Sequence, residues 1–151
     1  MTVTLAAEER EVALAEIDAV RAAAQETEYL QLLEQTAEAI ESGTVEPGRE
    51  ADELDRILGL ALQTGRIRAL YGPGGEQAAL RAYRKLPTGK ELADSAREVN
   101  EALAALAGRS LDQVSVAAVG PGAFTLSLVA GGAELSVRLD RQGARLASVG
   151  V

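Results

Sequence analysis

The sequence predicts an α+β protein, in which a helical N-terminal half precedes a C-terminal four-stranded antiparallel β-meander packed on the last helix. Three observations lead to this prediction. Residues 5–42 contain neither Gly nor Pro and carry apolar residues at helical spacing. Residues 92–106 repeat apolar residues in steps of four and three. From residue 112 onward, apolar residues alternate with a period of two, as in half-buried strands.

The first expected element is one long helix over residues 5–42, which Gly43 ends. Its apolar stripe shifts phase once, between Ala24 and Leu30. At 1.5 Å per residue this helix would reach roughly 57 Å, more than a globule of this size spans. The connection to the next helix, which starts at Pro47, is short. We therefore expect an antiparallel, coiled-coil-like helical hairpin over residues 1–71, continuous with residues 72–151 as one folded unit.

Part of that long helix has no evident partner within the chain, because the second helix has only about 25 residues by its pattern. The uncovered part carries Val12, Leu14 and Ile17, and Val20 continues the stripe. Twofold pairing is the commonest way to cover such a surface. We therefore expect a homodimer with these four residues at the interface.

The glycines after Tyr71 are interpreted as residues that end one helix and connect it to the next. The P-loop spacing Gly-x4-Gly-Lys-Ser/Thr is absent. Instead, Gly72 and Pro73 end one helix, and the two following glycines reverse the chain. A short helix then runs over residues 76–86, and Thr88 with Glu91 forms a capping box for the next helix.

An anion-binding site beside a helix N-terminus remains an alternative for the same segment. Its four basic residues would be Arg81, Arg84, Lys85 and Lys90. They would bind a phosphate or a carboxylate group.

The strands are best defined around Gly131-Gly132, because a two-residue loop fixes the register of a hairpin. Every apolar residue of the hairpin then falls on one face, and a slip of one residue would break this sorting. The expected pairs are Leu128 with Leu135, Leu126 with Val137, and Phe124 with Leu139. The apolar stripe of residues 92–106 is the natural cover for this face.

Composition excludes several classes of function. The chain has no His and no Cys, so thiol catalysis, Ser-His-Asp triads and metal sites built on imidazole or thiolate are excluded. No pair of carboxylates is marked out for acid–base catalysis, and we expect neither an enzyme nor a cofactor. The net charge of −8 argues against direct nucleic-acid binding. No stretch is long and apolar enough to span a membrane, and no secretory signal is evident, so we expect a cytoplasmic protein.

The net charge hides an asymmetry between the two parts of the chain. Residues 1–55 hold fifteen acidic and three basic residues, a net of −12, whereas residues 56–151 hold eight and twelve, a net of +4. Glu34, Glu38 and Glu41 crowd one helix face, and such like-charged pairs are destabilising. A basic partner would neutralise them. It lies either within the chain, over residues 66–97, or on another protein.

The acidic segment between the first two expected helices admits a metal-binding alternative. Oxygen ligands for a divalent ion would come from Glu41, Glu46, Glu50, Asp52 and Glu53. The favoured interpretation is a solvated hairpin tip, because the EF-hand pattern is absent.

Three classes of function stay open. The first is a non-enzymatic protein–protein interaction module, such as an adaptor, regulator or assembly factor, that acts through the long acidic helix. The second is a regulator of the transcription machinery. A helical hairpin with an acidic tip before a β-rich body resembles transcript-cleavage factors of the Gre type in outline. Their Gly-Asp-x-x-Glu-Asn tip motif is missing, and "SGTVEPGREAD" stands in its place. The third is an enzyme or binding protein for a ligand with a phosphate or carboxylate group, held by Arg81, Arg84 and Lys85.

Overall fold

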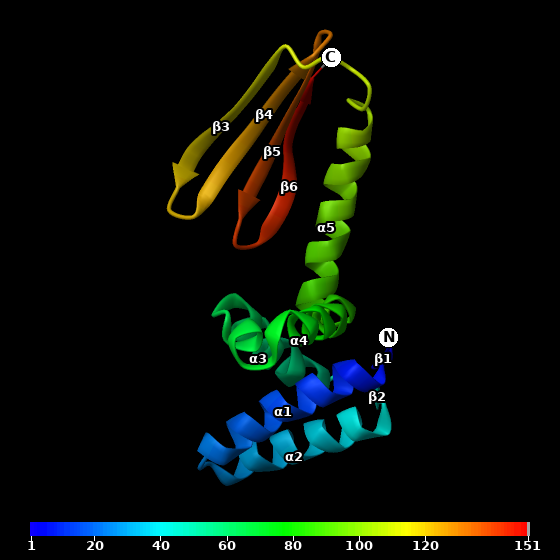
Figure 1. Cartoon of the computed structure of the whole chain (residues 1–151), viewed down its shortest axis with the longest axis vertical. Coiled ribbons are helices and arrows are strands. Elements are labelled where there is room, and N and C mark those ends of the chain that lie inside the picture. The colour runs from blue at the N-terminus through cyan, green and yellow to red at the C-terminus, as the bar shows by residue number, and fades with distance from the viewer. Residues whose placement is uncertain (151) are drawn as a thin grey trace. The chain divides into compact units, whose positions relative to one another are not determined.

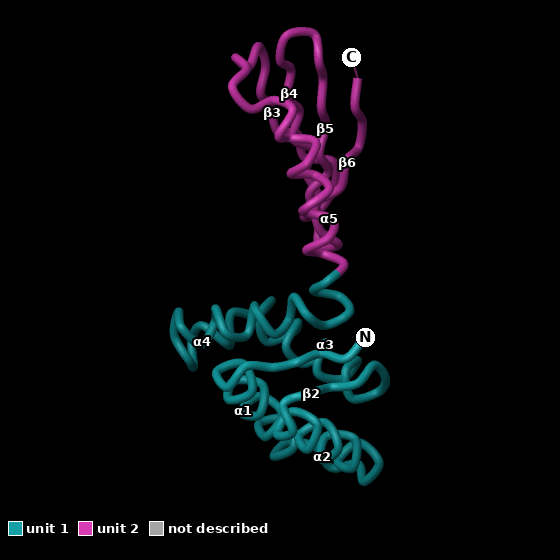
Figure 2. The backbone as a smooth tube through the Cα atoms, turned by 90° about the vertical axis from the view of Figure 1, so that its right-hand side faces the viewer, with its two compact units in different colours: residues 1–90 teal, residues 91–151 magenta. Residues whose placement is uncertain are grey.

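The structure, a computed structural model, describes residues 1–150 and shows an α+β protein (Figure 1). Five helices come before a four-stranded antiparallel sheet, and the last helix packs on that sheet, which confirms the expected fold class. The chain forms two compact units, Met1–Lys90 (unit 1) and Glu91–Val151 (unit 2; Figure 2). The division expected at residues 71/72 lies inside unit 1.

Two helices take the place of the single long helix expected over residues 5–42, so that expectation is wrong. Helix α1 spans Ala7–Ala23 and α2 spans Thr27–Ser42. The backbone between them is extended, with φ −77° and ψ 143° at Ala24. The two helices lie side by side (Figure 1), and both contribute to one core. The phase shift in the apolar stripe thus marks a chain reversal, which turns both stripes toward that core.

The segment after α2 is fastened to the N-terminus of the chain. Strand β1 (Val3–Thr4) pairs antiparallel with β2 (Thr44–Val45). The hydroxyl of Thr2 also donates a hydrogen bond of 2.7 Å to a carboxylate oxygen of Glu46. The acidic segment is therefore not the free hairpin tip that the sequence suggested. The resemblance to Gre-type factors in outline depended on such a free acidic tip.

Helices α3 (Arg49–Gln63) and α4 (Arg66–Lys85) complete the helical layer of unit 1. Helix α4 is kinked at Gly72, whose φ of 70° and ψ of −173° lie in a region open essentially to glycine alone. The helix resumes at Pro73, a residue suited to a first helical turn. The expectation that the two following glycines reverse the chain is wrong, because the only non-helical residue inside α4 is Gly72.

Helix α5 (Pro87–Ala104) begins with a cap that the sequence pattern did not indicate. Thr88 lies in its first turn rather than before it, so the expected capping box with Glu91 is wrong. The Thr88 hydroxyl donates to Asp55 of α3 at 2.6 Å, and the Thr88 N–H lies 3.3 Å from both oxygens of the same carboxylate. A carboxylate from another helix thus satisfies the positive end of α5.

The core of unit 1 is aliphatic and is shared by all its helices. Ile17, Leu33, Ile40, Leu54, Leu58 and Leu86 are its fully buried large members. Val12 lies in an adjoining cluster with Ile67 and Ala78. The expectation that Val12 and Ile17 lack a partner within the chain is therefore wrong. Helices α3 and α4 turn back across α1 and cover them, while Leu14 and Val20 pack half-buried at the edge of the same core.

Unit 2 contains the predicted meander in the order β3-β4-β5-β6. The strands span Gln113–Gly120, Ala123–Ala130, Ala133–Asp140 and Gly143–Gly150. The register expected around the Gly131-Gly132 loop is confirmed for all three pairs, Leu128 with Leu135, Leu126 with Val137, and Phe124 with Leu139. Helix α5 covers this face through Val99, Ala102 and Leu103, and Leu106, two residues beyond the helix, packs against the same cluster.

Candidate functional site

Two carboxylates on one face of α1 organise the polar interior of unit 1. Glu9 and Glu16 lie seven residues, or about two helical turns, apart. Glu9 is only 3% exposed, and Glu16 is only 2% exposed. A charge buried to this degree requires a partner. Both find theirs on α4, on opposite sides of the kink at Gly72.

Glu16 holds the segment of α4 before the kink. One of its oxygens lies 3.0 Å from Nε of Arg66, and the other accepts a hydrogen bond of 2.7 Å from the Tyr71 hydroxyl. Burial, together with the hydrogen bond to Glu16 and the charge of that carboxylate, raises the pKa of Tyr71 to about 12. Tyr71 is thus a neutral hydrogen-bond donor at ordinary pH, and it is unsuited to act as a base.

Glu9 holds the segment of α4 after the kink. It accepts hydrogen bonds from the N–H of Ala6 at 3.1 Å and from Nζ of Lys85 at 2.8 Å. Lys85 also donates to the carbonyl of Thr4 at 3.0 Å, so it joins α1, α4 and β1. Arg81 lies 3.7 Å from Glu9 and donates to Glu8 at 3.0 Å. We call the set Glu9, Glu16, Arg66, Tyr71 and Lys85 the α1–α4 clamp.

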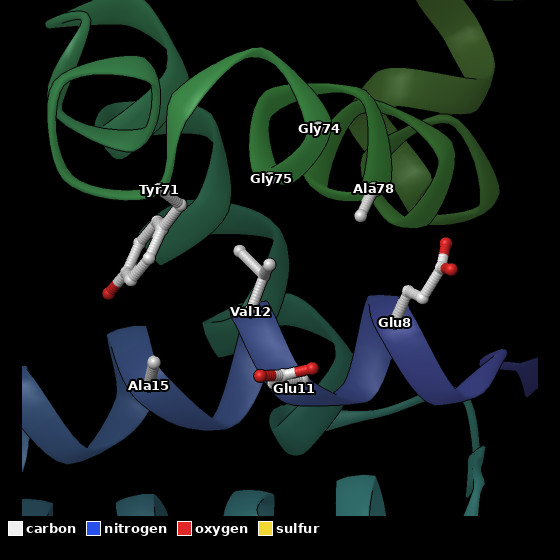
Figure 3. A pocket seen from close by; sticks show the side chains of 8 residues that line it. All are labelled: Glu8, Glu11, Val12, Ala15, Tyr71, Gly74, Gly75 and Ala78. Carbon is white, nitrogen blue, oxygen red and sulfur yellow. The ribbon is translucent and has the colours of Figure 1, made fainter.

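A cavity of about 440 Å³ lies between α1 and the kinked part of α4 (Figure 3). Its residues are Glu8, Glu11, Val12, Ala15, Tyr71, Gly74, Gly75 and Ala78. The Tyr71 hydroxyl points away from the carboxylates of Glu8 and Glu11 (Figure 3), consistent with its bond to Glu16. The cavity is thus lined by the acidic residues Glu8 and Glu11 and by small apolar residues. It presents no nucleophile paired with a base.

An apolar groove of about 480 Å³ runs between the second half of α1 and α3. Val20, Ile57 and Leu60 line it together with small residues, and Arg56 and Arg66 lie at its edge. Val20, one of the four expected interface residues, therefore faces a groove. Leu60, at 55% exposed, is the large apolar residue that this groove leaves in contact with solvent.

The proposed metal ligands do not gather at one point. Glu53 is bound to Arg56 and Tyr29, and Glu46 is bound to Thr2. Burial alone would raise the pKa of Glu53, but the hydrogen bonds from Arg56 and Tyr29 outweigh it and lower that pKa. Within residues 1–150, no group of three or more acidic side chains is placed to hold a metal ion.

The proposed anion-binding residues are divided between two roles. Arg81 and Lys85 are paired with acidic residues of α1. Arg84, Lys85 and Lys90 line one open depression beside residues 1–4. The cations are thus partly brought together, but Lys85 already carries a carboxylate partner.

The acidic residues of α1 and of α2 differ in their partners. The positive region after residue 56 neutralises α1 within the chain, through Arg66, Arg81 and Lys85. On α2, by contrast, Leu33, Ala37 and Ile40 face the core, and the outer face carries the exposed Glu34, Glu38 and Glu41. Among residues 1–150 none of these three glutamates has an ion pair. We call them the α2 acidic face.

Sequence reasoning did not identify the α1–α4 clamp. A usable signal existed, since Glu9 and Glu16 interrupt the apolar stripe that contains Ala13 and Ile17 at helical spacing. An acidic residue on the buried side of a helix requires a partner. The identity of that partner, 50 or more residues away, had no local signal.

Comparison of the chain with protein-family models, with curated proteins and with solved structures finds no match. No helix within residues 1–150 combines the length and the apolar character needed to cross a membrane.

Proposed function

We propose that this protein is a non-enzymatic interaction module, an adaptor, regulator or assembly factor, that binds a basic segment of a partner protein through the α2 acidic face. The observation that carries the proposal is the contrast between α1 and α2. The buried acids of α1 are neutralised by α4, whereas Glu34, Glu38 and Glu41 have no ion pair within the described chain.

The spacing of the three glutamates supports a partner that binds along one side of α2. Glu34 and Glu38 are four residues apart, and Glu38 and Glu41 are three apart, so all three lie on one side of α2. Adjacent like charges on a helix cost a few tenths of a kcal/mol per pair. A partner with Lys or Arg at matching intervals removes that repulsion and speeds association by electrostatic steering.

The anion-binding alternative has less support from the geometry. Arg81 and Lys85 already neutralise Glu8 and Glu9, so an anionic ligand would have to compete with carboxylates of the chain itself. The cavity between α1 and α4 has an acidic rim, which repels phosphate.

Affinity capture from the cells that produce the protein tests the proposal. The variant Glu34→Gln/Glu38→Gln/Glu41→Gln removes three charges from the α2 acidic face. The matched control, Glu91→Gln/Glu98→Gln/Glu101→Gln, removes three charges from exposed positions at the start of unit 2 and along α5. We expect a protein that the wild type and the control retain, that the α2 variant loses, and that dissociates as salt is raised.

Reconstitution with that purified protein completes the test. We expect the α2 variant to bind at least about tenfold more weakly than the control, which corresponds to about 1.4 kcal/mol. The proposal is wrong if both variants retain the same proteins with equal affinity.

A further inference from the structure

The side of the sheet that faces α5 is apolar across all four strands. Backbone pairing places its residues in three rows, each with one residue from each strand. The rows are Val114–Leu128–Leu135–Val149, Val116–Leu126–Val137–Leu146, and Ala118–Phe124–Leu139–Ala144. Such a face requires a cover along its full width.

Helix α5 is too narrow to supply that cover. Four strands spaced about 4.8 Å apart span roughly 14 Å between the outer axes, and their side chains extend further, whereas a helix is about 10 Å wide. Leu128, Leu135 and Val137 are therefore buried beneath α5. On the two outer strands the same face is more open: Val114 is 56% and Val116 is 63% exposed on β3, and Leu146 is 40% and Val149 is 66% exposed on β6.

The two flanks of α5 differ in chemistry. Exposed Ala93, Ala96 and Ala104, with Asn100, follow one flank at helical spacing, and the exposed Arg97 lies at its outer edge. Asp94, Glu98 and Glu101 follow the other flank. In Figure 2, α5 rises in front of the sheet with β3 to its left. Because an α-helix is right-handed, the alanine flank is the one on the β3 side. We call this flank, together with Val114, Val116, Ala118 and Phe124, the β3 step.

Strand β3 also lacks the features that protect an edge strand. Its eight residues, QVSVAAVG, include no charge and no Pro, and all of them are exposed. Its single irregularity lies between Ala118 and Gly120, beside the turn into β4. A long, uncharged edge of this kind is an association site unless something covers it.

We infer that the β3 step is the interface of a homodimer, in which a second copy of this chain docks its own β3 step about a twofold axis parallel to the strands. The apolar surface of β3 and β4 in one copy lies on the same surface of the other. The free edge of each β3 then abuts the alanine flank of the partner's α5, where small side chains permit close approach. One arrangement covers both the bare apolar strip and the unprotected edge.

The dimensions of the step fit a second copy. A helix axis lies about 10 Å from the sheet on which it packs, and two sheets packed face to face are also about 10 Å apart. The height of the step therefore equals the spacing that the second sheet requires. Strand β3 carries no charge, so two identical copies do not repel each other along it. The charge beside the alanine flank is that of Arg97, whereas the other flank of α5 carries three acids.

The estimated area of the step is that of a small interface. Eight residues at about 3.4 Å give a length of roughly 27 Å, and two strand spacings plus the helix flank give a width near 20 Å. The footprint of about 500 Å² per copy is smaller than the roughly 800 Å² of a standard interface. We therefore expect a reversible dimer that forms at micromolar concentrations.

Sedimentation of the full chain from about 1 to 200 μM tests the inference. We expect the wild type to shift from monomer to dimer in this range. Val116→Glu places a charge in the middle of the step, and it should raise the dissociation constant at least about tenfold. Ala117→Glu is the matched control, because Ala117 is its exposed neighbour on the opposite face of β3, and it should dimerise like the wild type.

Further measurements make each outcome decisive. Circular dichroism checks that the Glu variants fold, and Val116→Thr, which keeps the β-branched shape, should weaken the dimer several-fold even if Val116→Glu does not fold. A wild type that remains monomeric at 200 μM overturns the inference, as does equal weakening by Val116→Glu and Ala117→Glu.

Discussion

In unit 1 the apolar stripes of α1, α2 and α3 meet in one core, whereas in unit 2 the apolar face of the sheet is covered only beneath α5. The same contrast holds for charge. Unit 1 buries Glu9 and Glu16 and pairs both with residues of α4, while the ion pairs of unit 2, such as that of Asp140 with Arg145, lie near the surface. Unit 1 therefore covers its helix stripes and pairs its buried charges within its own chain, and unit 2 presents a sheet face that its own helix leaves partly open.

The largest expected effect that tests this contrast between the units comes from a cavity in the core of unit 1. Ile17→Ala removes a fully buried side chain from α1, and we expect it to lower the free energy of unfolding by about 3 kcal/mol. It should leave the dissociation constant of the dimer unchanged. Val116→Ala should show the reverse, with stability changed by less than about 0.5 kcal/mol and association weakened. Urea unfolding and sedimentation measure both quantities, and a dimer lost only in Ile17→Ala would return the interface to α1.

A smaller effect probes how closely α4 folds around its kink. A Cβ atom on Gly75 would lie 2.3 Å from Cβ of Tyr71, whereas a Cβ on Gly74 meets nothing within 4 Å. We expect Gly75→Ala to destabilise the protein by about 2 kcal/mol through overpacking. Gly74→Ala should be neutral or stabilising by up to about 1 kcal/mol, because it reduces the entropy of the unfolded chain. Equal melting temperatures for the two variants would show that the backbone of α4 relaxes at its kink and makes room for the added Cβ atom.

The smallest effect concerns the titration of the α1–α4 clamp. The pKa of Tyr71 is raised to about 12 from an ordinary value of 10, so the hydrogen bond from Tyr71 to Glu16 is intact below pH 10 and is lost as the pH rises toward 12. Absorbance of tyrosinate should therefore develop above pH 10, with Tyr71 ionising last. Glu16→Gln should lower the pKa of Tyr71, because the carboxylate that opposes its ionisation is gone. Glu38→Gln, on the exposed face of α2, is the control and should leave the titration unchanged.

Local signals were sufficient for unit 2 and insufficient for unit 1. The loop at Gly131-Gly132 sets its register over neighbouring residues, so period-two alternation predicted every pair of that hairpin. The reversal between α1 and α2 involves neither Gly nor Pro, and it forms because two helix stripes share one core. The phase shift of the stripe at Ala24 was visible, but its interpretation depended on tertiary packing.

The α1–α4 clamp was beyond prediction from one sequence for the same reason. Arg66, Arg81 and Lys85 were recognisable as a basic region that can neutralise an acidic helix. Which acids Arg81 and Lys85 meet depends on the direction of α4 after Gly72, and that direction depends on a single backbone conformation. The pattern therefore indicated neutralisation as an alternative but could not assign Glu9 to Lys85.

The bond between Glu9 and Lys85 spans 76 positions of the chain, and this separation has a consequence for the order of folding. During synthesis α1 emerges first, yet the cations for Glu9 and Glu16 emerge only with α4. Until then, two carboxylates occupy the side of α1 that is destined for the interior, and that side stays hydrated. The chain must close this long loop before the stabilising contact forms, and the entropy lost in doing so slows folding. Unit 1 thus has to wait for its last helix, whereas each hairpin of unit 2 can close as soon as its second strand exists.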